Sequence, residues 1–478
     1  MTDGKAWRLG SALTCLALLT ACAGGGGTPE TVAPAADETS IVLSDSGVEV
    51  DGQAAPDSAD AAVYVGADIV YYEDGRDETY GEGAEEDAHT AEEAAAHTVV
   101  TITQPGTYRV SGTLSLGQLA VDLGEDAEED PEAVVTLILD GADITCTVAP
   151  AVIFYNVYEC AAGDEEDASP AVDTSAAGAN VVLSDGSVNN ITGSYVARIY
   201  KEGTTDKLHK YDGAFYSKMS MNVDGETAGT GVLNLTADNE GLDSELHLTI
   251  NGGVINITAE NDGINTNEDG VSVTTINGGT ITITGGLGAE GDGIDSNGYL
   301  VVNGGTVLTT ANPQAGEGGI CLNGGTVIAL GSRNDSAAAD SAQALIELTF
   351  RTTVSEGSEV ELRDSGGTAV VSFTAPRDFS SATLSVPELA WDSTYTLWVD
   401  GVQQQYTGTG TMDAPGGGGG GQPPEGMEPP EGGQPPEKME PGGRPGDGGA
   451  ADEPGETAFV ITADSHAFQG VGDLVSGE

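Results

Sequence analysis

"NGGVINI", residues 251–257, decides the fold because it returns three more times, as "NGGTITI" at 277–283, "NGGTVLT" at 303–309 and "NGGTVIA" at 323–329. The copies begin 26, 26 and 20 residues apart. Asn-Gly-Gly accepts positive φ and makes a turn, and the apolar-polar alternation after it is that of a strand with one buried face. Short strands at this spacing predict a parallel β-solenoid, in which each repeat buries its inner face against its neighbours.

The Asn residues of these turns predict a further feature. Equivalent positions of neighbouring strands lie about 4.8 Å apart, so we expect Asn251, Asn277, Asn303 and Asn323 to stack as a ladder. The segment has no period near 3.6 residues, which argues against a helical repeat.

The rest of the chain divides into blocks around this repeat. Residues 98–160 hold further β-rich runs, and runs such as "STYTLWVDG" after residue 342 are typical of antiparallel strands that cap a repeat. Residues 413–456 are too rich in Gly and Pro to bury a core. The predicted blocks are a signal peptide at 1–21, a tether and acidic segment at 22–61, the repeat domain at 62–341, a C-terminal β-region at 342–412, a disordered linker at 413–456 and a tail at 457–478 that could add one strand.

The N-terminus predicts export. Lys5 and Arg8 precede an apolar run that is long enough for a signal peptide and too short for a stable membrane span. The run ends in "LTAC" at 19–22, which resembles a bacterial lipobox, so we expect cleavage before Cys22 and lipidation of that residue. The alternative is an ordinary signal peptide with a chance Cys.

The charge of the chain bounds its partners. With 77 Asp and Glu against 15 Lys and Arg, the formal net charge is -62, which would repel a nucleic acid backbone. A chain this acidic fits an environment rich in divalent cations, and calcium is the cofactor that we expect. An exported protein also meets oxidising conditions, so the closely spaced Cys146 and Cys160 could be joined.

Acidic turns accompany the repeat. "AENDGINTNEDG" at 259–270 returns as "AEGDGIDSNGYL" at 289–300, and "NEGLDSE" at 239–245 aligns with both. In a solenoid these Asp and Asn oxygens would form columns that can chelate a hard cation. They could equally be turn-formers without a metal.

The distribution of basic residues bears on catalysis. Residues 219–332 hold 14 Asp or Glu and no Lys or Arg, so the repeat lacks the base that a lyase acting on uronate polymers uses, and it lacks a cation to meet a substrate carboxylate. Calcium would then have to bridge the protein and an acidic glycan. A glycoside hydrolase built on a pair such as Asp243 and Asp292 stays open.

Basic and aromatic residues gather instead at 194–219, "SYVARIYKEGTTDKLHKYDGAFYSKM". Aromatic rings beside cationic donors suit a sugar surface, and the candidates are Tyr200, Lys201, Lys210, Tyr211 and Tyr216. The favoured alternative is a hairpin whose Tyr residues pack against the body and whose Lys residues balance acidic neighbours, because alternation would expose only half of the side chains.

Together the "NGGTVxI" strands, the "DGI" turns, "APAVIFYNVYEC" at 149–160 and "KLHKYDGAFYSKMSMNVDG" at 207–225 resemble the family of bacterial carbohydrate-binding parallel β-helix domains, the clostridial cellulose- and pectin-binding family. The resemblance runs over about 62–412. It implies an all-β, right-handed parallel β-helix at 62–341 that binds plant cell-wall polysaccharide and carries calcium without established catalysis. The implied calcium ligands, carried over where the acidic turns match, are Asp243, Asp262, Asn265, Asp292 and Asp295.

The resulting hypothesis is a non-catalytic, calcium-dependent binding protein for acidic polysaccharide such as polygalacturonate, with cellulose as a further candidate. We expect it outside the cell, attached to the membrane through its lipid alone. Two alternatives stay open: a pectate-lyase-like or hydrolytic enzyme, and a structural adhesin that calcium stiffens.

Overall fold

The computed structural model describes residues 38–73, 83, 85–161, 169–197, 210–286, 291–313, 315, 318–338, 341–406, 459–461 and 467–473. Cys22, Tyr200 and Lys201, and the predicted blocks 1–21 and 413–456, lie outside these residues. The described part is all-β, as expected, with three short helical segments, η1 (Glu85–Asp87), α1 (Ala91–Ala95) and η2 (Glu125–Glu129). None of the helices in this part is long and apolar enough to cross a membrane.

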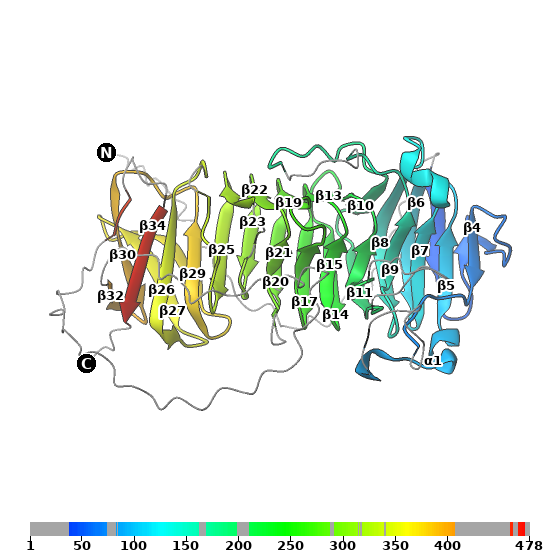
Figure 1. The fold of residues 1–478 in the computed structure, drawn as a ribbon, viewed down its shortest axis with the longest axis horizontal. Coiled ribbons are helices and arrows are strands. Elements are labelled where there is room, and N and C mark those ends of the chain that lie inside the picture. The colour runs from blue at the N-terminus through cyan, green and yellow to red at the C-terminus, as the bar shows by residue number, and fades with distance from the viewer. Residues whose placement is uncertain are drawn as a thin grey trace, which may run out of the picture.

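Strands stack along the long axis of the molecule in three rows (Figure 1). The first row contains β8 (Val135–Thr145), β10 (Ala179–Leu183), β13 (Met221–Gly225), β16 (Leu248–Ile250), β19 (Val273–Ile276), β22 (Tyr299–Val302) and β24 (Gly319–Leu322). The second row contains β11 (Val188–Gly193), β14 (Val232–Ala237), β17 (Val254–Ala259), β20 (Thr280–Thr284), β23 (Thr306–Thr309) and β25 (Thr326–Gly331). The third row contains β4 (Val63–Gly66), β5 (Thr98–Ile102), β7 (Gly117–Asp122), β9 (Val152–Asn156), β12 (Gly213–Ser217), β15 (Glu240–Ser244), β18 (Ile264–Thr266) and β21 (Ile294–Ser296).

Pairing within the rows is parallel, apart from the antiparallel β4–β5 pair. Three successive turns of the repeat each contribute one strand to each row; for example, β16, β17 and β18 pair with β19, β20 and β21. A strand in one row therefore contacts the equivalent strand of the next repeat, and a side chain at one repeat position lies beside its counterpart about 4.8 Å away.

The Asn-Gly-Gly turns have the conformation that the sequence predicts. The second glycine of each turn has positive φ, between +78° and +86°, at Gly253, Gly279, Gly305 and Gly325. The expected Asn ladder is confirmed: the Nδ2 of Asn277, Asn303 and Asn323 each donates to the Oδ1 of the preceding ladder Asn, at 2.9 to 3.0 Å. The alternation is confirmed as well, because Ile255 and Ile257 are buried and the intervening Asn256 is not.

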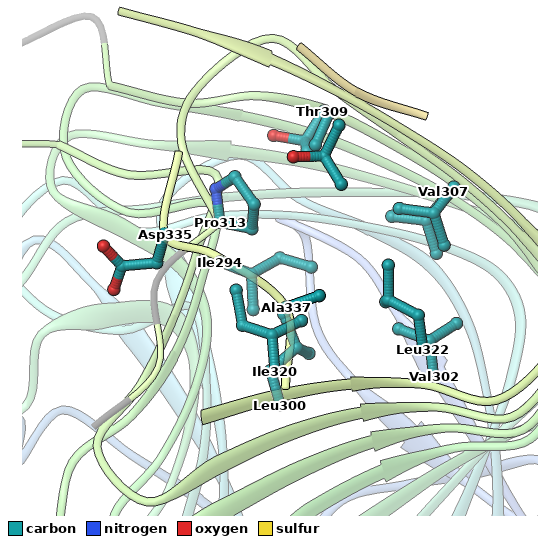
Figure 2. A pocket seen from close by; sticks show the side chains of 13 residues that line it. Ile294, Leu300, Val302, Val307, Thr309, Pro313, Ile320, Leu322, Asp335 and Ala337 are labelled. Carbon is teal, nitrogen blue, oxygen red and sulfur yellow. The ribbon is translucent and has the colours of Figure 1, made fainter. Parts of the chain in front are cut away.

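A single apolar core runs through the stacked repeats, from Ile41 to Leu345. Figure 2 shows its C-terminal end, where side chains of β21 to β24 converge on a cavity of about 10 Å³. Asp335 lies at one side of this cavity with its carboxylate directed away from the aliphatic groups (Figure 2). A space of this size holds at most one water molecule, so the side chains at this end of the core are closely packed.

The N-terminal end contains more strands than the sequence predicts. Besides β2 (Glu49–Val50) and β3 (Gln53–Ala54), β1 (Glu38–Leu43) pairs in parallel with β6 (Gly106–Leu114). Residues 38–54, which the sequence assigns to the tether, therefore extend the sheet. The physical reason is that Ile41 and Leu43 are buried in the main core.

Beyond β25, the C-terminal region folds around a second core that contains Phe350, Phe373 and Phe379. One set of its strands continues from β25: β26 (Leu345–Val354), β29 (Phe379–Ser385), β32 (Gln405–Tyr406) and β34 (Ala467–Asp473). The other set is β27 (Glu359–Asp364), β28 (Ala369–Thr374), β30 (Ser393–Val399), β31 (Val402–Gln403) and β33 (Phe459–Ile461). The tail thus adds two strands, and β34 lies beside β26 (Figure 1).

Candidate functional site

The third row carries a column of polar side chains at one repeat position. Register aligns Tyr216 of β12 with Asp243 of β15, Asp243 with Asn265 of β18, and Asn265 with Asp295 of β21. Three of the residues that the resemblance singles out, Asp243, Asn265 and Asp295, are therefore direct neighbours. We call them the first acidic column.

A second column lies three residues earlier in the same turns and consists of Glu240, Asp262 and Asp292. The Gly241 N–H donates to the Asp262 carbonyl at 2.9 Å, and the Gly263 N–H donates to the Asp292 carbonyl at 3.0 Å, which places these turns in register. The Asp262 Oδ1 also accepts the Asp292 N–H at 2.6 Å. We call these three residues the second acidic column.

Apart from Asp295, which is half-buried, the members of both columns are unusually buried for polar and charged groups. Asp243 is fully buried, Glu240 is 2% exposed, and Asp262, Asn265 and Asp292 are also buried. Three buried oxygens, Glu240 Oε2, Asp243 Oδ2 and Asn265 Oδ1, have no hydrogen-bond partner among the described residues. Buried polar atoms are normally paired, so this cluster of unpartnered acceptors points to a ligand that supplies positive charge.

Burial and mutual repulsion favour protons on these carboxyl groups when no cation is bound. Burial raises the pKa of Asp262 to about 7, and the charges of Asp295 and Asp292 also raise it. Burial, with the charge of neighbouring acids, holds the pKa of both Glu240 and Asp243 well above the ordinary range. Burial also raises the pKa of Asp295. A divalent cation would remove this cost by balancing the charge.

Lys210 adds a positive charge at the edge of the cluster. Its Nζ lies 2.6 Å from Asp212 Oδ2, and its side chain remains 46% exposed while that of Asp212 is 2% exposed. Burial opposes the charged form of Lys210, yet attraction from Asp212, Glu240 and Asp243 raises its pKa overall. Lys210 is therefore a protonated counter-ion of the acidic cluster.

A calcium ion fits the chemistry of this donor set, since calcium takes six to eight oxygen ligands. As the side chains stand, no group of three or more His, Cys, Asp or Glu in the described ranges is arranged to hold a metal. The donor set also includes an amide oxygen, because Asn265 Oδ1 is one of the unpartnered acceptors. By charge and oxygen type, Asp243, Asp262 and Asn265 are residues that could hold a calcium ion.

A family model for "Carbohydrate-binding domain-containing protein" matches residues 96–368, which is more than half of the 478-residue chain. The chain belongs to this carbohydrate-binding family. Both acidic columns lie within the matched residues. No curated protein matches the sequence significantly.

Among solved structures, the chain is similar to one titled "Structure of the polysaccharide lyase-like protein from C. thermocellum, Gadolinium derivative". The two are 22% identical, the match covers 63% of this chain and 94% of that chain, and the TM-score is 0.39.

The predicted aromatic surface of this carbohydrate-binding protein is not formed by Tyr211 and Tyr216. Tyr216 is fully buried and donates to Glu245 Oε1, and Tyr211 is 6% exposed and packs edge-on against Tyr216. The reason is that β12 lies between β9 and β15 with both faces covered. The favoured alternative holds for these residues: Val196 and Tyr211 form an antiparallel bridge, and Lys210 balances Asp212.

The disulfide considered between Cys146 and Cys160 is not formed, and both thiols are free. Cys146 is 1% exposed in the core after β8, while the Cys160 Sγ lies 3.8 Å from the Asp173 carbonyl. Burial raises the pKa of each thiol to about 11. The two side chains thus occupy separate environments.

Sequence reasoning missed Glu240, Asp212 and the proximity of Lys210 to the acidic columns. A signal existed for Glu240, since "NEGLDSE" places it at the position of Asp262 and Asp292. Asp212 begins an Asp-Gly pair like those of the acidic turns. Lys210 had no such signal, because its position depends on the Val196–Tyr211 bridge.

Proposed function

We propose that this member of the carbohydrate-binding family is a non-catalytic binding module that holds acidic plant cell-wall polysaccharide through calcium. The calcium would be held by the two acidic columns, and the three rows would wind as a right-handed parallel β-helix. The observation that carries the proposal is the alignment of buried carboxylates with unpartnered oxygens at Glu240, Asp243 and Asn265.

The charge of the chain supports an acidic glycan bridged by metal. A formal net charge of -62 repels a polyanion, and a divalent cation reverses that repulsion locally. Polygalacturonate carries one carboxylate per sugar, so its repeat offers regularly spaced anions to such a cation. Cellulose has no carboxylate and would have to bind by hydrogen bonding and stacking alone.

The cellular placement in this proposal rests on sequence alone. The apolar run after Arg8 and the "LTAC" segment support export and lipidation at Cys22. The protein would then present its binding surface outside the cell, and the membrane would contact only the lipid.

The test is retention of the mature protein on gelled polygalacturonate, in calcium and in chelator, with the supernatant assayed for cleavage. Retention should require calcium, and the double change Asp262→Ala with Asp292→Ala should remove it. Glu260→Gln is the matched control, because Glu260 is exposed two residues before Asp262. Retention that persists in chelator and in the double variant would contradict the proposal. A calcium-dependent rise in melting temperature without glycan binding would favour the structural adhesin.

A lyase is the second candidate, and the position of Lys210 favours it. A lyase base must lie near the metal, and Lys210 contacts the acidic cluster through Asp212. Its raised pKa keeps the amine protonated and unable to accept a proton, which is why we prefer binding over catalysis. Unsaturated product that disappears in Lys210→Met would establish the lyase.

A further inference from the structure

The fold brings a cation to the repeat that the sequence does not place there. The guanidinium of Arg377, just before β29, donates from Nη1 to the Gly285 carbonyl at 3.0 Å, across 92 residues of chain. The expectation that this surface lacks a cation able to meet a carboxylate is therefore wrong at its C-terminal end. Arg377 uses one N–H donor in this contact, and it has no ion pair among the described residues.

Arg377 lines a cleft of about 240 Å³ between the last repeats and the C-terminal strands. The cleft is somewhat smaller than the roughly 300–1,000 Å³ of pockets for drug-sized ligands, which suits a single sugar ring. Its polar side chains come from the repeats and residue 332 on one side, and from β26 and residues 377–380 around the start of β29 on the other: Thr310, Asn312, Ser332, Thr353, Arg377, Asp378 and Ser380.

These groups offer both donors and acceptors to a polyhydroxylated ligand. Asp378 accepts the Glu356 N–H at 2.7 Å through Oδ1, which leaves Oδ2 as an acceptor. Asn312 accepts the Arg333 N–H at 3.0 Å through Oδ1, which leaves its Nδ2 donors. Sugar hydroxyls both donate and accept, so they can pair with both residues.

The guanidinium decides the chemical class of the ligand. A planar guanidinium with free donors binds a carboxylate through two parallel hydrogen bonds, a stronger contact than one with a neutral hydroxyl. We propose that this Arg377 cleft binds one carboxylate-bearing sugar residue, with Arg377 on the carboxylate and Asn312 and Asp378 on the hydroxyls. This contact needs no calcium.

The cleft lies next to the acidic columns. Gly291 lines it, and Asp292 of the second column follows Gly291 in the chain. One glycan chain can therefore meet calcium at the columns and Arg377 in the cleft. The inference rests on the proposed function in that both sites take the same acidic glycan. The two contacts differ in their need for metal, because only the contact at the columns requires calcium.

Because only the acidic columns require calcium, the cleft can be tested separately in chelator. The probe is a galacturonate trimer, added to the full mature protein in chelator and followed by calorimetry, with the neutral cellotriose as the matched ligand. We expect trimer binding without calcium and at least about tenfold weaker binding in Arg377→Met, the loss expected for a hydrogen bond to a charged group. Arg377→Lys should retain part of the affinity for the trimer. Wild type and Arg377→Met should have equal affinity for cellotriose.

Arg333→Met is the control for charge, because Arg333 is exposed beside Ser332 without lining the cleft. It should leave trimer affinity within about twofold, since exposed charges outside the contact are screened by salt. Thr353→Trp fills the cleft from an exposed position and leaves Arg377 in place, so it should abolish trimer binding even if Arg377→Met folds poorly.

Absence of trimer binding to wild type in chelator would overturn the inference, as would equal affinity of wild type, Arg377→Met and Thr353→Trp. Neither of these outcomes would affect the calcium-dependent retention of wild type on polygalacturonate gel, because gel retention tests the acidic columns. If wild type binds the trimer in chelator but is not retained on the gel in calcium, the proposed function is contradicted and the inference about the Arg377 cleft remains supported.

Discussion

Asp262→Asn is the change that most directly tests the acidic columns. The amide keeps an oxygen that can accept the Asp292 N–H, now at 2.6 Å, while it removes the charge. Burial raises the pKa of Asp262 from 3.8 to about 7, a shift that corresponds to roughly 4 kcal/mol in the free energy of unfolding. Since the folded state holds the proton more tightly, this contribution is complete below pH 3.8 and is lost as pH rises to about 7.

In chelator, wild type should therefore lose stability between pH 4 and 7, and Asp262→Asn should lose less, by up to roughly 4 kcal/mol. Calcium should narrow the stability difference between the two proteins at pH 7, because it stabilises the ionised wild type by about 2.7 kcal/mol at a concentration 100 times its Kd and has a weaker site in the variant. Urea denaturation at a series of pH values, in chelator and in calcium, measures both effects. Glu260→Gln should follow wild type. Parallel curves for wild type and Asp262→Asn in both media would refute the assignment of the columns to calcium.

Three further changes test the architecture around the site. Tyr216→Phe removes the donor to Glu245 and should cost about 1–3 kcal/mol in urea denaturation, yet it should leave glycan retention unchanged because Tyr216 is fully buried; lost retention at wild-type stability would contradict this. Gly263→Ala would place a Cβ 2.2 Å from Ile283 Cγ2 and 2.7 Å from the Gly293 carbonyl oxygen, so the variant should lose about 1–3 kcal/mol, and an unchanged midpoint would show that the turns are looser than described. Asn277→Ala breaks two ladder hydrogen bonds on an exposed edge and should cost about 1 kcal/mol without altering the calcium response; a changed calcium midpoint would link the ladder to the metal site.

The sequence predicted the repeat because its signal is local. Asn-Gly-Gly requires a turn, and alternation after it requires one buried face, so the second row and its Asn ladder could be derived from a few residues per repeat. The alignment of Asp243, Asn265 and Asp295 followed from the same register.

Features that depend on distant contacts could not be derived in this way. Arg377 reaches Gly285 only because β29 pairs with β25 and β26 at the end of the stack. Alternation predicted that half of the basic and aromatic side chains of 194–219 are exposed, but β12 is covered on both faces and its five residues are all buried. The sequence assigned residues 38–54 to the tether because no other strand-like run lies near their short apolar run in the sequence. The strand partner of β1 is β6, which is distant in the sequence.

The chain contains two kinds of Asp or Asn column, and their difference argues for a metal at one of them. In the Asn ladder each amide from Asn277 on donates to the preceding one, the side chains are exposed and neutral, and the oxygens are satisfied without a ligand. In the acidic columns all members but the half-buried Asp295 are buried, Asp243 Oδ2 and Asn265 Oδ1 lack partners among the described residues, and the pKa of Asp243 is raised by burial and by Glu240. A turn needs only the first arrangement. The second costs free energy unless a cation is present, so turn formation alone does not account for buried carboxylates at the same position of successive repeats.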